Sequence, residues 1–428
     1  MNIAEIVNKL RDCECGREHK VDIKAVEIGH GMLKNTAEIL KRNNFPTKIL
    51  VVADKNSLKA SDGILEVLEN GGITYELKLY DDLREAEADD AADVAKASAM
   101  YEGILSVGSG SCNDICRRAA LLADKDFAIF ATAPSMDGFA SGTSPISHNN
   151  FKQTLPARQP SIIIGDTTIL AAAPAELKAA GFGDLIAKYV ALVDWRVSNL
   201  TTGEYYCEHI AQISRDVMKR ISANAHLVQS SDEETVGNMM EALVLSGLLM
   251  KLADSVRIAS RTEHIISHFW EIKKMEKGLI SDFHGKKCGV ASLFTSRIYY
   301  DILSRENVKF HADNTDWDKV YEIYGEQVRP EIEKLNNPTV TDETTVEILE
   351  KNWDKIRSII KEELPSPEEV ERLLKTAGCA TTIEEIAVDR DLGLNGVMYH
   401  PYMRHRMTLM RLLPMTDIKI DWENVLRG

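Results

Sequence analysis

Short apolar runs alternate with helical patterns between Val21 and about Ala140, and this alternation limits the possible fold more than any other feature of the chain. Such runs are typical of β-strands when turn residues bound them. Strands that are joined through helices usually run parallel. We therefore predict a mostly parallel sheet flanked by helices. The predicted strands are VDIKAVEI (21–28), TKILVVAD (47–54), TYELKLY (74–80), GILSVGSG (103–110) and FAIFATAP (127–134).

The pattern changes after one more apolar run, SIIIGD at residues 161–166. The segment before it, residues 141–160, contains Gly, Ser and Pro and fits either a hairpin or a loop at the edge of the domain. Residues 169–200 and 241–260 have helical periodicity without the alternation of a strand. We therefore predict an α/β domain at residues 1–166 and an all-helical domain at residues 167–428.

Composition limits the partners and the compartment. A formal charge of -15 opposes non-specific binding to nucleic acid or to an anionic membrane surface. The opening residues lack the basic start and apolar run of a signal peptide, and we expect no membrane-spanning segment. Seven scattered cysteines fit reduced thiols better than a disulfide framework. These features favour a cytoplasmic protein.

A glycine-containing turn, Gly108-Ser109-Gly110-Ser111, joins the fourth predicted strand to the helical pattern NDICRRAALLA. Glycines let a pyrophosphate approach the backbone, and the start of a helix offers free N–H groups to it. Asn113 stands where the usual dinucleotide fingerprint has its third glycine, so an ordinary tight turn is the alternative.

Two further segments could complete a nucleotide site. Asp54 ends a predicted strand, where a carboxylate can accept hydrogen bonds from a ribose diol and repel a 2′-phosphate, or can cap the next helix. The loop from Thr132 to Ser141, TAPSMDGFAS, directly follows another strand. Its hydroxyl groups could bind a nucleotide, although the same residue types form ordinary turns.

The helical half contains candidate metal ligands in three segments. Asp184 in GFGDLIAKY, His264 in EHIISH and His284 in FHGKKCG would give two imidazoles and one carboxylate, a set that leaves a position open for substrate. Each alone could equally be a cap, a surface group or a core hydrogen-bonding residue. His268 is four residues from His264, so both lie on one helical face and could share a metal or divide metal and substrate contact.

Cys13-Glu-Cys15-Gly-Arg-Glu-His19 is a second possible metal cluster. Two thiols and one imidazole lack a full ligand set, and a surface loop is the preferred interpretation of this segment.

Taken together, GSGSCND, TAPSMDGFAS, GFGDLIAKY, EHIISH and FHGKKCG resemble the motif series of sn-glycerol-1-phosphate dehydrogenases. That family belongs to the superfamily of dehydroquinate synthases and iron-containing alcohol dehydrogenases. The chain length and the segment TGEYYC resemble the bacterial AraM-like branch in particular. The resemblance covers about residues 20 to 300 and implies a Rossmann-like nucleotide domain joined to a helical metal-binding domain, in a homodimer.

The resemblance also implies roles for individual residues. It implies that Asp184, His264 and His284 hold nickel or zinc, that Asp184 also lies near the substrate, and that Asp137 and His268 face the substrate. Ser109 replaces a glycine that is frequent in the family, which leaves the choice between NAD and NADP open. The residues implied to contact the nucleotide are Asp54, Gly110, Ser111, Cys112, Asn113, Asp114, Thr132, Ala133, Pro134, Ser135 and Ser141.

The implied reaction interconverts dihydroxyacetone phosphate and sn-glycerol 1-phosphate, so the substrate phosphate needs cationic donors. Candidates beside the metal motifs are Lys188, Arg261, Lys286 and Lys287. A basic segment near the C-terminus, which contains Arg404 and Arg406, could line the active-site cleft or form a subunit contact. Each could equally be a structural or solvated cation. The rival functions are those of another superfamily member, either an alcohol or glycerol dehydrogenase or a dehydroquinate synthase-like cyclase, and that of a non-catalytic NAD-binding scaffold.

Overall fold

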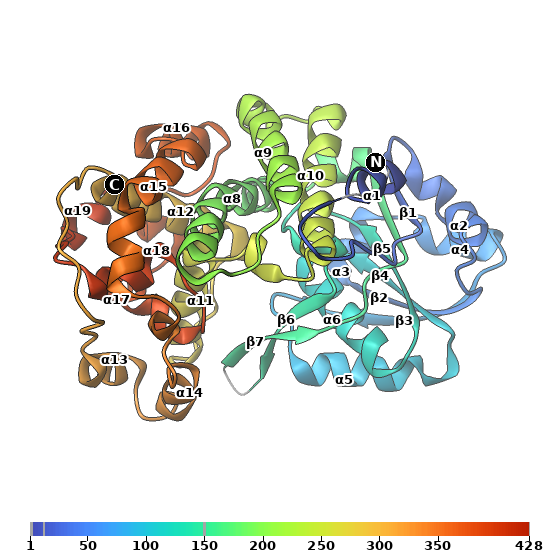
Figure 1. The fold of residues 1–428 in the computed structure, drawn as a ribbon. Coiled ribbons are helices and arrows are strands. Elements are labelled where there is room, and N and C mark those ends of the chain that lie inside the picture. Colours follow the sequence, from blue (N-terminus) through green and yellow to red (C-terminus); the bar gives the residue numbers. More distant parts are fainter. Residues whose placement is uncertain (1–2, 12, 149–150, 428) are drawn as a thin grey trace. The chain divides into compact units, whose positions relative to one another are not determined.

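The computed structural model describes residues 3–11, 13–148 and 151–427 (Figure 1). Two compact units are present: residues 1–185 with 219–255, and residues 186–218 with 256–428. The strands are β1 (Ala25–Gly29), β2 (Lys48–Asp54), β3 (Thr74–Tyr80), β4 (Gly103–Gly108), β5 (Asp126–Ala131), β6 (Thr143–His148), β7 (Phe151–Pro156) and β8 (Ile162–Asp166).

The first unit is built on a six-stranded parallel sheet with the order β1-β8-β5-β4-β2-β3. Every predicted strand is present, and residues 143–156 form the antiparallel hairpin β6-β7. The helices up to residue 252 are α1 (Ile3–Lys9), α2 (Met32–Arg42), α3 (Lys55–Ala60), α4 (Ile64–Asn70), α5 (Ala88–Ala97), α6 (Gly110–Leu122), α7 (Thr167–Ala171), α8 (Ala175–Thr202), α9 (Glu208–Ala223) and α10 (Glu233–Leu252).

Both faces of the sheet are covered, which explains why its central strands are almost wholly apolar. Val51 and Val107 pack with α2 and α4 in one core, together with Phe130. On the opposite face the thiol of Cys112 in α6 contacts the carbonyl of Val52, and the hydroxyl of Ser106 contacts that thiol.

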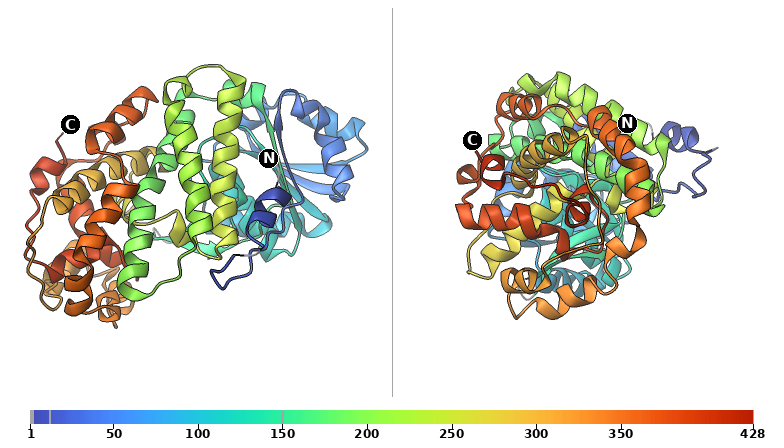
Figure 2. Two further views of the ribbon diagram at one scale, coloured as in Figure 1. Left: turned by 45° about the horizontal axis from the view of Figure 1, so that its top comes forward. Right: turned by 60° about the vertical axis from the view of Figure 1, so that its left-hand side comes forward.

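The chain beyond Asp166 is helical, and no strand follows β8 among the described residues. The predicted α/β and all-helical fold classes are therefore confirmed. The two compact units do not divide at residue 166, because α10 and parts of α8 and α9 belong to the first unit. The remaining helices (Figure 2) are α11 (Thr262–Met275), α12 (His284–Leu303), α13 (Trp317–Tyr324), α14 (Arg329–Leu335), α15 (Val346–Glu363), α16 (Pro367–Thr376), α17 (Arg390–Tyr399), α18 (Leu409–Leu412) and α19 (Trp422–Val425).

Helix α10 is the one described helix that is long and apolar enough to cross a membrane, with a mean hydropathy of 1.2. Because 72% of its apolar window is buried inside the protein, it has the character of a core helix. Among the described residues, which include all seven cysteines, there is no disulfide bond.

Candidate functional site

Three predicted nucleotide-binding segments meet at one edge of the sheet. Asp54 ends β2, Gly108 ends β4, and Thr132 follows β5. These strands are neighbours in the order β5-β4-β2, and they are parallel, so their carboxyl ends lie side by side. This is the edge at which open α/β sheets bind their ligands.

Helix α6 begins at Gly110, directly after this edge, with Ser109 as its N-cap. A Cβ on Gly110 would lie 3.1 Å from Cγ of Met136, so a side chain there would crowd the loop opposite. The amide of Asn113 is fully buried, and neither its oxygen nor its nitrogen has a hydrogen-bond partner within the described chain. A buried amide without a partner, near the start of a helix whose first N–H groups have none within the helix, fits a polar ligand at this position.

Asp54 does cap a helix. Its Oδ1 accepts a hydrogen bond of 2.7 Å from the backbone N–H of Ser57, at the start of α3. The second carboxylate oxygen leaves capacity for a ribose diol, because an ionised carboxylate accepts several hydrogen bonds. The capping role and the nucleotide role are therefore compatible.

The loop from Thr132 to Ser141 is held between α10 and the part of α8 that belongs to the first unit. A Cβ on Gly181 of α8 would lie 1.9 Å from the carbonyl oxygen of Pro134. A Cβ on Gly247 of α10 would lie 2.8 Å from the carbonyl oxygen of Asp137. Only glycine permits these approaches. The two glycines thus fix the loop from two sides, a role that the sequence analysis missed.

Polar contacts then orient Asp137. Its backbone N–H donates to Oδ2 of Asp184 at 2.8 Å, and its Oδ2 accepts from the hydroxyl of Ser246 at 3.0 Å. Asp184 is fully buried in α8. The structure therefore brings two of the predicted substrate-facing carboxylates together, and it adds Ser246, which has no recognisable motif in the sequence.

In the second unit, the three predicted histidines form a cluster. His264 and His268 lie on α11, and His284 is the first residue of α12. The ring centroids of His264 and His284 are 5.0 Å apart, and those of His268 and His284 are 5.2 Å apart. Ligand atoms of His264, His284 and Cys288 lie within 4.8 Å of one another.

Carboxylates of α11 orient two of these imidazoles. Glu263 contacts Nδ1 of His264 at 2.7 Å, and Glu271 contacts Nδ1 of His268 at 3.1 Å. A carboxylate at Nδ1 favours the tautomer that keeps its proton there, which turns the lone pair of Nε2 outward. Metal-binding histidines commonly have such a carboxylate partner. The donor set therefore fits a divalent transition metal.

The four candidate phosphate donors near the metal motifs have protein partners. Lys188 donates to the carbonyl of Ala259 at 3.0 Å, and Lys286 pairs with Asp282 at 2.8 Å. Lys287 donates to the hydroxyl of Ser281, and fully buried Arg261 pairs with Glu204 at 3.0 Å. These contacts are those of structural cations.

Arg406 differs, because three other arginines and only one carboxylate, that of Glu204, act on its charge. Its guanidinium donates to the carbonyl of Ser260 at 2.7 Å. Burial, and then the nearby charges of Arg404, Arg261 and Arg257, lower the pKa of Arg406 to about 9. An anion bound there would offset both effects.

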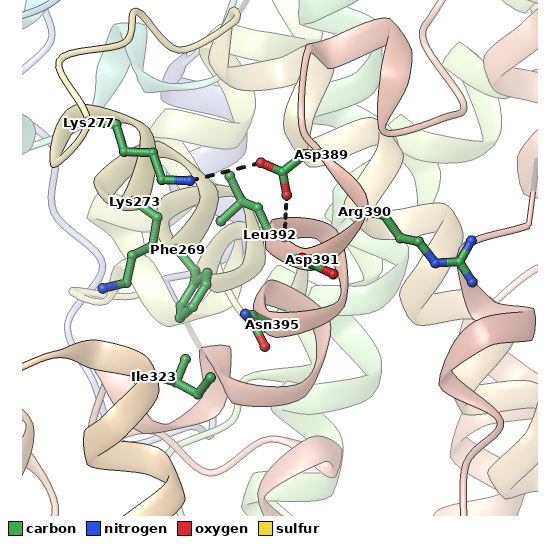
Figure 3. Close-up of a pocket in the computed structure, with 9 residues that line it drawn as sticks. All are labelled: Phe269, Lys273, Lys277, Ile323, Asp389, Arg390, Asp391, Leu392 and Asn395. Atoms are coloured by element: carbon green, nitrogen blue, oxygen red, sulfur yellow. Dashed lines mark hydrogen bonds and ion pairs between the residues drawn. The ribbon is translucent and has the colours of Figure 1, made fainter.

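A pocket of about 490 Å³ lies beside the C-terminal half of α11, between Phe269, Lys273 and the start of α17 (Figure 3). Lys277 and Asp389 face each other in it at 4.0 Å, and Asp389 also caps α17 through the N–H of Leu392. None of the predicted site residues lines this pocket.

Comparisons with known proteins define the class first. The family model of the iron-containing alcohol dehydrogenases matches residues 27–174. The crystal structure of a probable glycerol dehydrogenase from Sinorhizobium meliloti superposes with a TM-score of 0.61 at 16% identity and covers 94% of both chains. The NADH-dependent butanol dehydrogenase A of Thermotoga maritima gives a TM-score of 0.59 at 14% identity, covering 96% of this chain and 98% of that one. The fold is that of the iron-containing alcohol dehydrogenases.

Sequence relatives then narrow the class to a family. The glycerol-1-phosphate dehydrogenase [NAD(P)+] of Geobacillus stearothermophilus is 28% identical over 401 residues, which cover 91% of this chain and 92% of that protein. The protein of that name from Bacillus velezensis is 31% identical over 305 residues, covering 69% and 77%. The chain belongs to the glycerol-1-phosphate dehydrogenase family.

Proposed function

We propose that this chain is an NAD(P)-dependent, metal-assisted oxidoreductase that interconverts dihydroxyacetone phosphate and sn-glycerol 1-phosphate. The observation that carries the proposal is the sequence similarity to glycerol-1-phosphate dehydrogenases over 91% of the chain. A helix N-terminus at the carboxyl edge of a parallel sheet and a cluster of oriented histidines support it. The two alcohol dehydrogenase structures described above share the fold, but their sequences are only 16% and 14% identical to this chain.

In this proposal Asp184, His264 and His284 hold one divalent ion, nickel or zinc, and Cys288 is close enough to the two histidines to contribute. A bound divalent ion would polarise the ketone oxygen of the substrate. Glu263 keeps the His264 imidazole in the tautomer that a metal requires.

The nucleotide would lie along the carboxyl edge of the sheet. The N-terminus of α6 would bind the pyrophosphate, and Asp54 would accept the ribose hydroxyls and so favour NAD over NADP. The remaining proposed contacts are Gly110, Ser111, Cys112, Asn113, Asp114, Thr132, Ala133, Pro134, Ser135 and Ser141.

During reduction, C2 of dihydroxyacetone phosphate accepts hydride from NADH, and the oxygen on that carbon needs a proton. We assign His268 to this proton transfer, through water, because Glu271 holds the proton on Nδ1 and can stabilise a charged ring. Asp137 and Asp184 would position the substrate hydroxyls, since their hydrogen bonds fix the loop that carries them.

Arg406 is the proposed partner of the substrate phosphate. Burial and, after it, like-charged neighbours lower its pKa, and a phosphate dianion would relieve the repulsion with charge-assisted hydrogen bonds. We further propose a cytoplasmic homodimer. Light scattering tests the dimer, and cell fractionation tests the location.

The decisive experiment is NADH oxidation with dihydroxyacetone phosphate by enzyme that has been stripped of metal and reloaded with nickel or with zinc. We expect metal-dependent turnover and a product that chiral analysis identifies as sn-glycerol 1-phosphate. Equal turnover of unphosphorylated dihydroxyacetone, or none with either metal, would refute the assigned substrate.

A further inference from the structure

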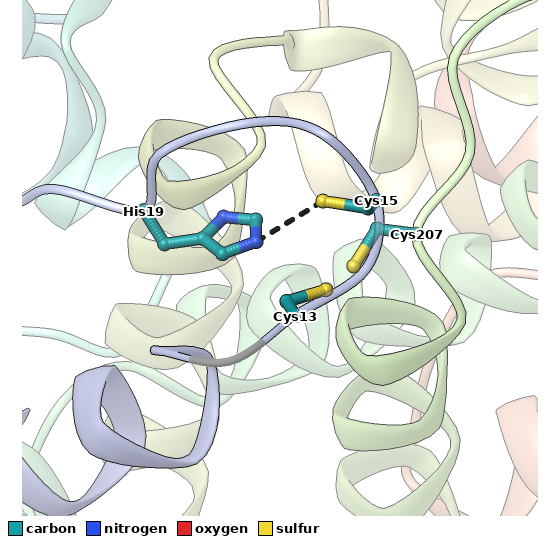
Figure 4. Close-up of side chains that lie close together, drawn as sticks. All are labelled: Cys13, Cys15, His19 and Cys207. Carbon is teal, nitrogen blue, oxygen red and sulfur yellow. Dashed lines mark hydrogen bonds between the residues drawn. The ribbon is translucent and has the colours of Figure 1, made fainter.

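The loop between α1 and β1 gathers three metal-binding side chains. Cys13, Cys15 and His19 offer ligand atoms that lie within 4.8 Å of one another (Figure 4). Gly16 has a φ of 79°, a left-handed conformation that suits glycine and turns the chain back after the second cysteine. Sγ of Cys15 and Nε2 of His19 are 3.3 Å apart. Cys207, also labelled in the figure, is a residue of the second unit.

The orientation of His19 is an independent sign of metal binding. Its Nδ1 lies 2.7 Å from the carbonyl oxygen of Leu252, which can only accept, so Nδ1 carries the proton. The lone pair is then on Nε2, the atom that faces the thiol of Cys15. A ring nitrogen held by a carbonyl while the other faces thiols is the arrangement of a metal-ligating histidine. The ring is also buried, with 7% of the residue exposed.

The end of α10 anchors the loop. His19 binds the carbonyl of Leu252, and Arg17 donates to the carbonyl of Ala253 at 2.6 Å. The last carbonyls of a helix have no partner within the helix, so these two contacts satisfy groups that otherwise need water. The same helix carries Ser246 and Gly247, which touch the Asp137 loop.

We propose that Cys13, Cys15 and His19 bind a structural zinc ion that fastens the N-terminal segment to the end of α10. Two thiolates with an imidazole are ligands that zinc prefers, and water or a further thiolate would complete a tetrahedron. The cluster shares no residue with the nucleotide site or the histidine cluster, so this zinc would stabilise the fold without entering the reaction.

The first test uses cobalt in a chain whose proposed catalytic metal site is removed by His264→Ala and His284→Ala. We expect one equivalent of bound cobalt with thiolate-to-metal charge-transfer absorption in the near ultraviolet. Adding Cys13→Ser and Cys15→Ser should abolish that absorption, whereas Glu18→Gln in the same loop should preserve it. The proposal is overturned if the absorption persists after Cys13→Ser and Cys15→Ser, or if the chain with only the two histidine substitutions does not show it.

A second test uses the unaltered protein, so it does not depend on how the variants fold. Thiol alkylation at Cys13 and Cys15 is followed by peptide mass spectrometry before and after chelation. Metal-bound thiolates react slowly, so we expect both cysteines to be protected in the zinc-loaded protein and modified once zinc is removed. Equal modification before and after chelation contradicts the proposal. Because neither test measures turnover, their outcome is separate from that of the proposed reaction.

Discussion

Gly181→Ala should show how tightly the loop from Thr132 to Ser141 is fixed. The added methyl carbon would lie 1.9 Å from the carbonyl oxygen of Pro134, whereas ordinary contact begins near 3.4 Å. The backbone must therefore move by about 1.5 Å, because the Cβ of residue 181 and the carbonyl oxygen of Pro134 are both fixed to it. Overpacking of this kind costs up to about 3 kcal/mol. Alanine regains about 1 kcal/mol through its better helix propensity. We expect a net loss of about 2 kcal/mol.

The effect on activity should be larger than the effect on stability suggests. Asp137, which we propose positions the substrate, lies on the displaced loop, and a misplacement of about 1 Å in a positioning group can lower a rate about 100-fold. Urea unfolding and kcat for dihydroxyacetone phosphate reduction measure the two effects. Gly142→Ala is the matched control, because its methyl carbon would meet only a lysine methylene at 3.6 Å. A Gly181→Ala enzyme with the stability and kcat of the unaltered protein would refute the reasoning.

Four further variants test separate parts of the molecule. Asp54→Asn should keep the helix cap, because asparagine also caps well, but should raise KM for NADH and weaken discrimination against NADPH in steady-state assays. Glu263→Gln should lower metal affinity about 10- to 100-fold in chelator competition, with an unchanged circular dichroism spectrum. Arg406→Gln should raise KM for dihydroxyacetone phosphate and leave turnover of dihydroxyacetone nearly unchanged; a parallel loss with both substrates would contradict phosphate binding. Burial lowers the pKa of His400 from 6.5 to about 3, so the unfolded chain takes up a proton that the folded chain refuses, and stability should fall as pH decreases through that window. Between pH 6.5 and 5 this amounts to about 2 kcal/mol, which His400→Gln should remove in urea titrations at the two pH values.

The sheet could be predicted because its strands are buried on both faces and therefore appear as nearly continuous apolar runs. The sequence of residues 141–160 does not distinguish a hairpin from a loop, because its alternation is weak; in the structure this segment contains β6 and β7. The compact units could not be predicted, because a helical pattern does not show which helices pack together. Helix α10 thus joins the first unit despite its place late in the chain.

The residue types of the candidate site can be predicted from the sequence, but the hydrogen-bond partners of these residues are harder to predict. The spacing of Glu263, His264, His268 and Glu271 is visible in the sequence, but which carboxylate meets which ring depends on side-chain conformations. The lysines beside the metal motifs were plausible phosphate donors by proximity in sequence alone. Their hydrogen bonds and ion pairs with protein groups depend on the tertiary structure and on side-chain conformations, so they cannot be predicted from the sequence.

The ten residues from Thr262 to Glu271 carry two imidazoles and the carboxylate that orients each of them. The geometry of these rings is therefore a local property of one helix rather than a product of distant segments. Such a helix can be inherited, lost or transplanted as a unit. A designer who grafts α11 onto another helical scaffold would transfer the proposed metal ligand His264 and the proposed proton-transfer residue His268 together with the acid that orients each, and would need to supply only the remaining metal ligands.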